Sequence, residues 1–202
     1  MRSSDKKRKT RQTGCFICGT AGFSARKFRG LTVDGQSYDI VFCKGCTLGR
    51  TDPFLDEDKL NAIYSSTYRE NDSTRFFAPV EKLVRFLRAG RSRGIEKYSQ
   101  KGRVLDIGCG RGDFLAMMAA RGWDGYGLEL DKRVESHSSP GVTLRYGGIG
   151  DVKFPDSYFS AVTLWHSFEH MREPEKAVTE CRRVLKREGL LMVAVPNSSS
   201  IQ

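Results

Sequence analysis

The residues of this chain that could do chemistry begin with one acidic, glycine-rich run. Asp106 is followed by a glycine at every second position, at Gly108, Gly110 and Gly112. Glycines let a backbone approach a ligand where side chains would collide, and a helix that starts just after such a turn presents unpaired N–H groups to the same place. The run therefore predicts a loop that holds a nucleotide-like cofactor.

The elements on either side must position this loop. The apolar run Val104–Ile107 predicts a buried strand before it, and Asp113–Arg121 predicts a helix after it. Gly122 is a typical residue for the end of that helix, and Trp123–Leu130 predicts the next strand. This second strand delivers Glu129 to the same edge of the sheet as the glycine loop.

Asp106 and Glu129 decide which cofactor fits. A carboxylate at Asp106 would repel the pyrophosphate of a dinucleotide or of ATP, but it suits a cofactor with an ammonium group. Asp113 stands where the dinucleotide fingerprint requires its last glycine, and no Gly-Lys-Ser/Thr follows to make a P-loop. Glu129, about 20 residues beyond the glycines, can accept hydrogen bonds from both ribose hydroxyls. Among the nucleotide-like cofactors, S-adenosylmethionine fits best. The alternative interpretation of the glycine run is an ordinary tight connection between a strand and a helix that binds no cofactor.

Two segments, Val104–Leu115 and Gly127–Asp131, resemble the first two motifs of class I S-adenosylmethionine-dependent methyltransferases. The resemblance implies an open, mostly parallel Rossmann-like α/β sheet. It also implies a set of cofactor-binding residues, namely Asp106, Gly108, Cys109, Gly110, Glu129, Leu130, Asp151 and His166. Asp151 would face the exocyclic amine of adenine, or it is an exposed acid in a turn.

Four cysteines form two Cys-x-x-Cys pairs, Cys15 with Cys18 and Cys43 with Cys46. Four thiolates in a tetrahedral array select zinc, so residues 14–50 are predicted to form a zinc ribbon. Redox dithiols or an iron–sulfur cluster are the alternatives. With four sulfur ligands no position stays open for a catalytic water, so the zinc would be structural.

Residues 51–100 are predicted to form a helical linker on the substrate side. Tyr64 and Tyr68 lie one turn apart on a short amphipathic helix, and a second helix over 76–98 has a basic face. That face is interpreted as exposed to solvent, although it could also contact the phosphate groups of a ligand. The order of cysteine pairs, tyrosines, helix and glycine loop is similar to that of bacterial zinc-ribbon methyltransferases of sugars and small molecules, among them deoxysugar C-methyltransferases. The resemblance implies that the tyrosines help to build a substrate pocket, and otherwise they pack the joint between domains.

The core over 101–202 is predicted to continue with strands at Val142–Arg145, Phe159–Trp165 and Leu190–Val195. A helix from Pro174 to Gly189 lies between the last two. Ser160 stands where the resembled family usually has aspartate. This makes five strands of an expected seven, so the core is expected to be incomplete at its C-terminus and inactive by itself.

The run His166-Ser-Phe-Glu-His170 matches, as letters, the motif of inverted zinc proteases. Its place after a parallel strand instead resembles the segment beside the transferred methyl group in the methyltransferase family. His166 is therefore expected to border the substrate, and His166, Tyr64 or Tyr68 would act as the general base. Glu169 and His170 are expected to cap the helix that follows.

The composition is that of a globular protein, with 39% hydrophobic and 29% charged residues among 202. The formal net charge is +10, and six basic residues against a single acid lie within 1–13. This tail is interpreted as solvated, with RNA as the alternative partner. No segment has the length of a membrane span and no signal-peptide core is present, so a cytoplasmic location is expected.

Three functions remain open on the sequence alone. The favoured one is an S-adenosylmethionine-dependent methyltransferase of a small molecule, and the expected acceptor is a sugar or a precursor of the cell envelope or of secondary metabolites. One alternative is an RNA methyltransferase that binds RNA through its zinc ribbon and its basic tail. The other is a non-catalytic cofactor-binding module or an inactive fragment. The apolar strand Leu190–Val195 would be an unprotected sheet edge, which predicts self-association.

Overall fold

The computed structural model describes residues 14–15, 17–33, 36–53, 89–132, 140–171 and 173–197. The chain divides into two compact units between Thr74 and Arg75. Tyr64 and Tyr68 lie outside the described residues, as does the basic tail over 1–13, so their predicted roles stay predictions.

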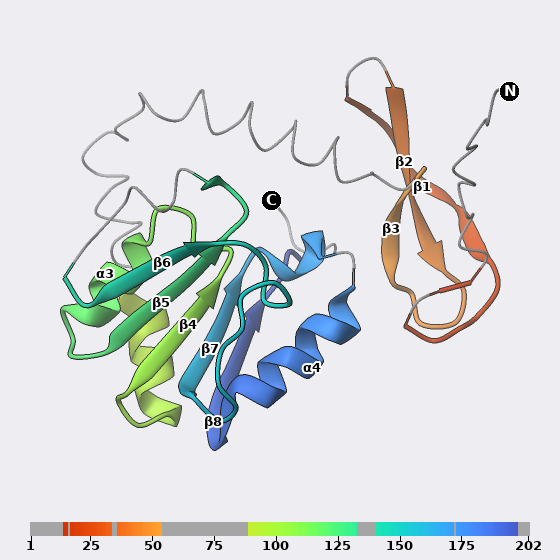
Figure 1. Ribbon diagram of the computed structural model, residues 1–202. Coiled ribbons are helices and arrows are strands. Elements are labelled where there is room, and N and C mark those ends of the chain that lie inside the picture. Colours follow the sequence, from red (N-terminus) through yellow and green to blue (C-terminus); the bar gives the residue numbers. More distant parts are fainter. Residues whose placement is uncertain are drawn as a thin grey trace, which may run out of the picture. The chain divides into compact units, whose positions relative to one another are not determined.

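The N-terminal unit contains a three-stranded antiparallel sheet in the order β1 (Phe23–Val33), β2 (Gln36–Cys43), β3 (Gly49–Asp52) (Figure 1). Tyr38 and Val41 of β2 are buried. β2 ends at Cys43, so this strand leads directly into the second cysteine pair. The third strand extends the sheet to Asp52, two residues beyond the predicted ribbon boundary at residue 50.

The C-terminal unit is built on a five-stranded sheet in the order β6-β5-β4-β7-β8 (Figure 1). All its neighbouring strands pair in parallel. The strands are β4 (Arg103–Ile107), β5 (Asp124–Glu129), β6 (Val142–Tyr146), β7 (Phe159–Trp165) and β8 (Leu185–Ala194). The predicted parallel Rossmann-like α/β sheet is therefore confirmed. All the loops that follow β4, β5, β6 and β7 meet at the C-terminal edge of the sheet, where open α/β sheets bind ligands.

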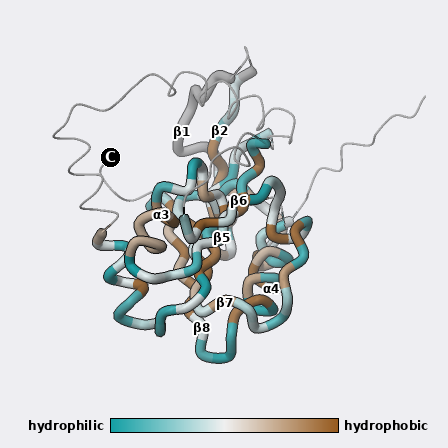
Figure 2. The backbone as a smooth tube through the Cα atoms, turned by 60° about the vertical axis from the view of Figure 1, so that its left-hand side comes forward, coloured by the Kyte–Doolittle hydropathy of each residue, from teal (hydrophilic) through white to brown (hydrophobic). Residues whose placement is uncertain are grey.

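Helices cover both faces of this sheet. On one face, the helical residues 89–98 and α3 (Asp113–Ala119) pack on Val104 and Ala161. On the other face, α4 (Pro174–Val184) buries Ala177, Cys181 and Val184 against residues of β4, β5 and β7. The tube of α4 changes between brown and teal along its length in Figure 2, as expected for a helix with one buried face. The helical residues 89–98 thus belong to the packed core.

The predicted boundary between α4 and the last strand was wrong. The sequence predicted a helix as far as Gly189, whereas α4 ends at Val184 and β8 begins at Leu185. The reason is strand pairing, since Leu185 pairs with Phe159 while Leu190 pairs with Ala161. More residues lie between these pairs on β8 than on β7, so the exposed residues 186–188 bulge outwards.

Among the described strands, β8 forms one edge of the sheet. Its residues Leu191 and Val193 are 36% and 41% exposed, and Val195 just beyond it is 49% exposed. Ser160, on the neighbouring strand, accepts a hydrogen bond of 3.1 Å from Lys186 Nζ at its hydroxyl.

Within the described residues, no helix combines the length and the apolar character that a membrane crossing requires.

Candidate functional site

The glycine loop after β4 is held against two neighbouring segments. The N–H groups of Gly108 and Cys109 both donate to the carbonyl oxygen of Leu128 on β5, at 2.8 and 3.1 Å. Gly108 has a φ of 76°, and a Cβ atom there would lie 2.5 Å from Ser167 Cβ. Only glycine fits this position, since a side chain would be strained and would collide with the segment after β7. The loop is therefore a cradle with backbone at its surface.

Glu129 lies directly over this loop. Its Oε2 atom accepts a hydrogen bond of 2.9 Å from the Gly110 N–H, and its Oε1 atom accepts one of 2.8 Å from the Leu130 N–H. The carboxylate is half-buried, so it keeps access to solvent and to a ligand. Leu130 beside it is 62% exposed and provides an apolar surface at the rim. The structure thus brings together the glycine loop and the acid that the sequence predicted for a ribose.

Asp106 is buried at the end of β4, with only 3% of its surface exposed. Burial raises the pKa of its carboxyl to about 7, although a hydrogen bond from Thr163 and the charge of Arg91 act in the opposite direction. Thr163 Oγ1 on β7 donates that hydrogen bond to Asp106 Oδ1 at 2.7 Å. A ligand with a positive charge would favour the ionised carboxyl, because opposite charges stabilise each other strongly in a buried site.

Cys109 and Asp151 have local partners of their own. A Cβ atom at Gly127 would lie 2.5 Å from Cys109 Sγ, so this thiol packs on β5 as a small core residue. Asp151 Oδ2 accepts a hydrogen bond of 2.9 Å from the Gly148 N–H in the turn after β6. The structure thus gives Asp151 a role in the turn, and its predicted contact with adenine stays a prediction.

His166 follows β7 in a left-handed backbone conformation, with a φ of 55°. Its N–H donates to the Ala194 carbonyl oxygen at 2.9 Å, and its side chain is 52% exposed. Ser167 Oγ donates a hydrogen bond of 2.6 Å to the Ile107 carbonyl oxygen, so this segment rests on the strand that leads into the glycine loop. His166 is thus positioned at the C-terminal edge of the sheet, with its ring accessible.

The rest of the His-x-x-Glu-His run does not form the helical site of a zinc protease. Phe168–His170 forms a single 3-10 turn, so the histidines do not share the α-helical face that a zinc protease needs. Glu169 Oε1 lies 3.9 Å from both His166 Nδ1 and His170 Nε2. The N-cap residue of α4 is Glu173, whose side chain makes no capping hydrogen bond, so the expectation that Glu169 and His170 cap this helix stays a prediction.

Two residues that the sequence analysis missed also lie at this edge. The guanidinium carbon of Arg91 is 4.5 Å from the centre of the Trp165 ring, at the end of β7. The basic face of the helix was interpreted as solvated, yet Arg91 lies one turn before Ile95, which is fully buried. That spacing of four residues is the signal that could have separated Arg91 from its exposed neighbours.

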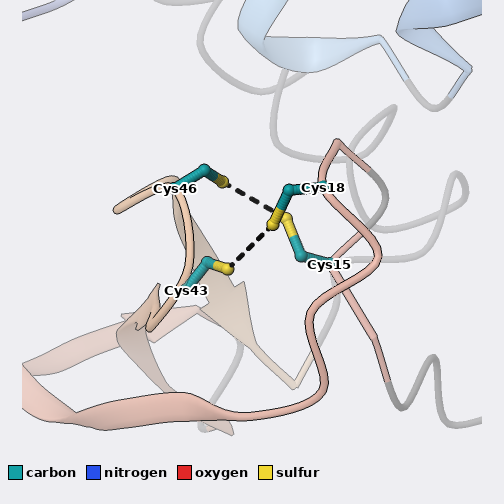
Figure 3. Close-up of side chains that lie close together, drawn as sticks. All are labelled: Cys15, Cys18, Cys43 and Cys46. Carbon is teal, nitrogen blue, oxygen red and sulfur yellow. Dashed lines mark hydrogen bonds between the residues drawn. The ribbon is translucent and has the colours of Figure 1, made fainter.

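The four cysteines of the N-terminal unit come together from two similar turns (Figure 3). In the first turn the Gly19 N–H donates to the Cys15 carbonyl oxygen at 2.8 Å, and in the second the Thr47 N–H donates to the Cys43 carbonyl oxygen at 3.0 Å. Thr20 Oγ1 lies 3.2 Å from Cys18 Sγ, and hydrogen bonding to Thr20 lowers the pKa of this thiol to about 6. Cys18 therefore favours the thiolate, which is the form that binds metals.

The sulfur positions fit a tetrahedral metal ion. The Sγ atoms of Cys15 and Cys46 are 3.6 Å apart, and those of Cys18 and Cys43 are 3.5 Å apart. All four sulfurs lie within 4.8 Å of one another. A zinc ion with bonds of about 2.3 Å to four sulfurs requires sulfur separations of roughly 3.8 Å, so the site could accept zinc with little movement.

Comparisons with known proteins agree with this geometry. A family model described as a methyltransferase domain matches residues 74–202. A protein of Mycolicibacterium smegmatis, named a probable S-adenosylmethionine-dependent methyltransferase, is 33% identical over 100 residues, which cover 46% of this chain and 38% of that protein. A ubiquinone biosynthesis O-methyltransferase of Paraburkholderia phymatum is 34% identical over 104 residues, covering 47% of this chain and 44% of that enzyme. This chain therefore spans less than half the length of these curated relatives.

A solved structure supports the same fold. A SAM-dependent methyltransferase from Archaeoglobus fulgidus superimposes with a TM-score of 0.51 at 26% sequence identity. The superposition covers 58% of this chain and 55% of that structure.

Proposed function

Because this chain belongs to the family of methyltransferase domains, we propose that it transfers the methyl group of S-adenosylmethionine to a small-molecule acceptor. When bound, this cofactor supplies an activated methyl group on a sulfonium that is a good leaving group. The observation that carries the proposal is the contact between Glu129 and the Gly110 N–H, which sets a carboxylate over a glycine cradle. A carboxylate in that place suits the two ribose hydroxyls of the cofactor.

The residues present fit the rest of the cofactor as well. Asp106 offers a buried carboxyl for an ammonium group, and Thr163 fixes its orientation. Gly108 is exposed and has no side chain, so a ligand could approach its backbone from the side away from Ser167. Leu130 offers an apolar surface at the rim beside Glu129. Together these residues bind and orient a zwitterionic nucleoside, and this chemistry does not suit a pyrophosphate.

Catalysis in this proposal is mainly alignment, since a positioned nucleophile needs little further activation. His166 is the described residue best placed to receive a proton from the acceptor, because its ring is accessible at the C-terminal edge of the sheet. Tyr64 and Tyr68 remain the other candidates for this role. The identity of the acceptor decides whether an oxygen, a carbon or a nitrogen atom is methylated.

For the acceptor we propose a sugar-linked or cell-envelope precursor. The support is the arrangement of cysteine pairs ahead of a methyltransferase core, which is similar to that of sugar-modifying zinc-ribbon enzymes. One relative is named for ubiquinone biosynthesis, so a phenolic small molecule is the nearest alternative within the same class. RNA is the alternative outside this class.

For the four cysteines we propose one structural zinc ion. The support is the separation of the sulfurs, at 3.6 and 3.5 Å, and the mutual distances within 4.8 Å. An ion bound there would tie the two turns together and stabilise the small N-terminal sheet, because binding free energy is folding free energy at such sites.

Methyl transfer is tested with the full chain and cofactor labelled on the methyl group. Acceptors in the panel are nucleotide sugars, phenolic quinone precursors and RNA. We expect label in a small molecule and none in RNA. His166→Ala should reduce the turnover with that acceptor, whereas the matched change His170→Ala, four residues further along the chain, should leave it unchanged.

Label in RNA alone would replace the proposed acceptor class with nucleic acid. Cofactor binding without transfer to any member of the panel would instead favour a non-catalytic binding module.

A further inference from the structure

Ser167 joins the segment after β7 to the strand that leads into the glycine loop. Its Oγ atom donates a hydrogen bond of 2.6 Å to the carbonyl oxygen of Ile107, the last residue of β4. Ser167 is also the N-cap residue of the 3-10 turn Phe168–His170, yet its side chain makes no capping hydrogen bond there. A serine at an N-cap usually bonds to an N–H group of its own turn. This hydroxyl instead connects two segments that are distant in the sequence.

The same serine packs directly on the first glycine of the loop. A Cβ atom at Gly108 would lie 2.5 Å from Ser167 Cβ and 3.2 Å from Ser167 Oγ. The Gly108 N–H donates to the Leu128 carbonyl oxygen at 2.8 Å, and Leu128 directly precedes Glu129, the acid proposed to bind the ribose. A movement of Ser167 relative to the glycine loop would therefore break a hydrogen bond and also disturb a close packing contact.

Ser167 directly follows His166, whose backbone has an uncommon conformation. The φ angle of His166 is 55°, a region that residues other than glycine seldom occupy unless the surrounding contacts hold them there. One such contact is the hydrogen bond of 2.9 Å from the His166 N–H to the Ala194 carbonyl oxygen on β8. The Ser167 hydroxyl provides another, on β4. The accessible ring of His166 is thus anchored to both strands that neighbour β7.

We propose that Ser167 is a positioning residue for methyl transfer, which keeps the His166 ring in a fixed place relative to the glycine loop. This inference rests on the proposed function, in which His166 receives the proton of the acceptor. Ser167 acts through His166, since its own hydroxyl is bonded to the Ile107 carbonyl oxygen. A misplacement of about 1 Å can lower a rate by about a hundredfold. Loss of this hydrogen bond should therefore lower turnover without lowering the affinity for the cofactor.

The first measurement separates cofactor binding from turnover in the full chain. Ser167→Ala removes the hydroxyl and keeps the Cβ atom that packs on Gly108. By calorimetry, this variant should bind S-adenosylhomocysteine within about twofold of the parent. With the nucleotide sugar or quinone precursor that the parent methylates, kcat should fall by about tenfold to a hundredfold while KM stays within about twofold. Ser167→Thr, which keeps a hydroxyl, should restore most of the turnover.

The second measurement observes His166 directly and requires no acceptor. The chain has three histidines, and the variants His166→Gln and His170→Gln assign the imidazole signals in the NMR spectrum of protein with isotope-labelled histidine. Binding of S-adenosylhomocysteine should shift the His166 signal of the parent, because Ser167 links this residue to the glycine loop. In Ser167→Ala this shift should be lost, whereas the His170 signal should be the same in both proteins.

Ser99→Ala is the matched control. Ser99 Oγ donates a hydrogen bond of 2.9 Å to the carbonyl oxygen of Ser160, so this hydroxyl also connects a separate segment to a strand, but at the opposite edge of the sheet. Both variants lose a hydrogen bond of the same kind and should lose similar stability in urea. Only Ser167→Ala should lose turnover and the response of His166.

A parallel loss of S-adenosylhomocysteine affinity and turnover in Ser167→Ala would overturn the inference, since Ser167 would then only shape the glycine loop. Turnover and a His166 response equal to those of the parent would overturn it too, while the cofactor site and methyl transfer would stand. If the parent does not bind S-adenosylhomocysteine, or transfers no methyl group to the panel, the proposed function fails, and the inference with it.

Discussion

Thr163 Oγ1 on β7 donates a hydrogen bond of 2.7 Å to Asp106 Oδ1 on the neighbouring strand β4. Both residues are buried, so the carboxyl is held in one orientation at the point where the glycine loop begins. A hydroxyl is a neutral partner, and it compensates only part of the cost of burying a charge. The pKa of Asp106 is therefore raised from its ordinary value of 3.8 to about 7, with burial as the main cause.

This shift predicts how stability without cofactor depends on pH. Because the pKa of Asp106 is higher in the folded chain, the folded chain binds more protons than the unfolded one between pH 3.8 and about 7. The contribution of Asp106 to the free energy of unfolding is therefore fully present below pH 3.8 and decreases as the pH rises to about 7. Asp106→Asn removes this dependence, so the variant should gain stability relative to the parent across that window.

Urea unfolding of both proteins at about pH 5, 6, 7 and 8 measures this difference. The advantage of the variant should grow by at most about 1.4 kcal/mol per pH unit and should level off above pH 7. A difference that stays constant from pH 5 to 8 would show that Asp106 is ionised throughout.

Gly127 provides a second test of the packing beneath the site. A Cβ atom there would lie 2.5 Å from Cys109 Sγ and 2.6 Å from Leu144 Cδ2. Gly127→Ala should therefore destabilise the chain by about 1–3 kcal/mol, the usual cost of overpacking a core. Gly150→Ala is the matched change, since a Cβ atom at Gly150 meets nothing within 4 Å. Equal unfolding midpoints for the two variants would contradict the packing described here.

Much of the fold could be predicted because its signals are local. Phe159–Trp165 is a mostly apolar run, and the structure has a strand with the same bounds. The end of α4 could not be predicted, because Leu185 continues the apolar period of the helix in the sequence. What makes Leu185 part of a strand is its pairing with Phe159, a contact between distant segments.

The same distinction applies to the site. Glu129 and the glycines follow a known spacing, so the sequence placed them at one edge of the sheet. The spacing of four residues between Arg91 and Ile95 could have indicated that Arg91 faces the sheet, but its contact with Trp165 could not be predicted, because Trp165 lies far along the chain. Thr163 was likewise interpreted only as part of an apolar strand, since its partner Asp106 lies on another strand.

The cysteine cluster predicts one zinc per chain. Cys43→Ser removes one of four ligands and should lower the zinc content and unfold the N-terminal sheet, because metal binding and folding are coupled there. Cys181→Ser is the matched control, since Cys181 lies on the buried face of α4 in the other unit, and the change should leave the zinc content unchanged. Elemental analysis of protein purified without chelator measures both. Parent protein without zinc, or with iron instead, would contradict the assignment.

The exposed apolar residues at the β8 edge predict self-association. Val193→Lys places a charge on this edge and should shift the protein towards the monomer in sedimentation at increasing concentration, because edge charges oppose strand pairing. Thr179→Lys adds the same charge at an exposed position of α4 and should leave the association unchanged. A parent chain that stays monomeric at all concentrations would contradict this prediction.

The cofactor is expected to bind between Glu129 and the glycine loop. Calorimetric titration of S-adenosylhomocysteine should show one site per parent chain. Glu129→Ala should weaken it by about 1.5–3 kcal/mol for each ribose hydrogen bond lost, whereas Asp124→Ala, at the opposite end of β5, should have no effect. No binding to the parent chain, or equal binding to the parent and Glu129→Ala, would contradict the account.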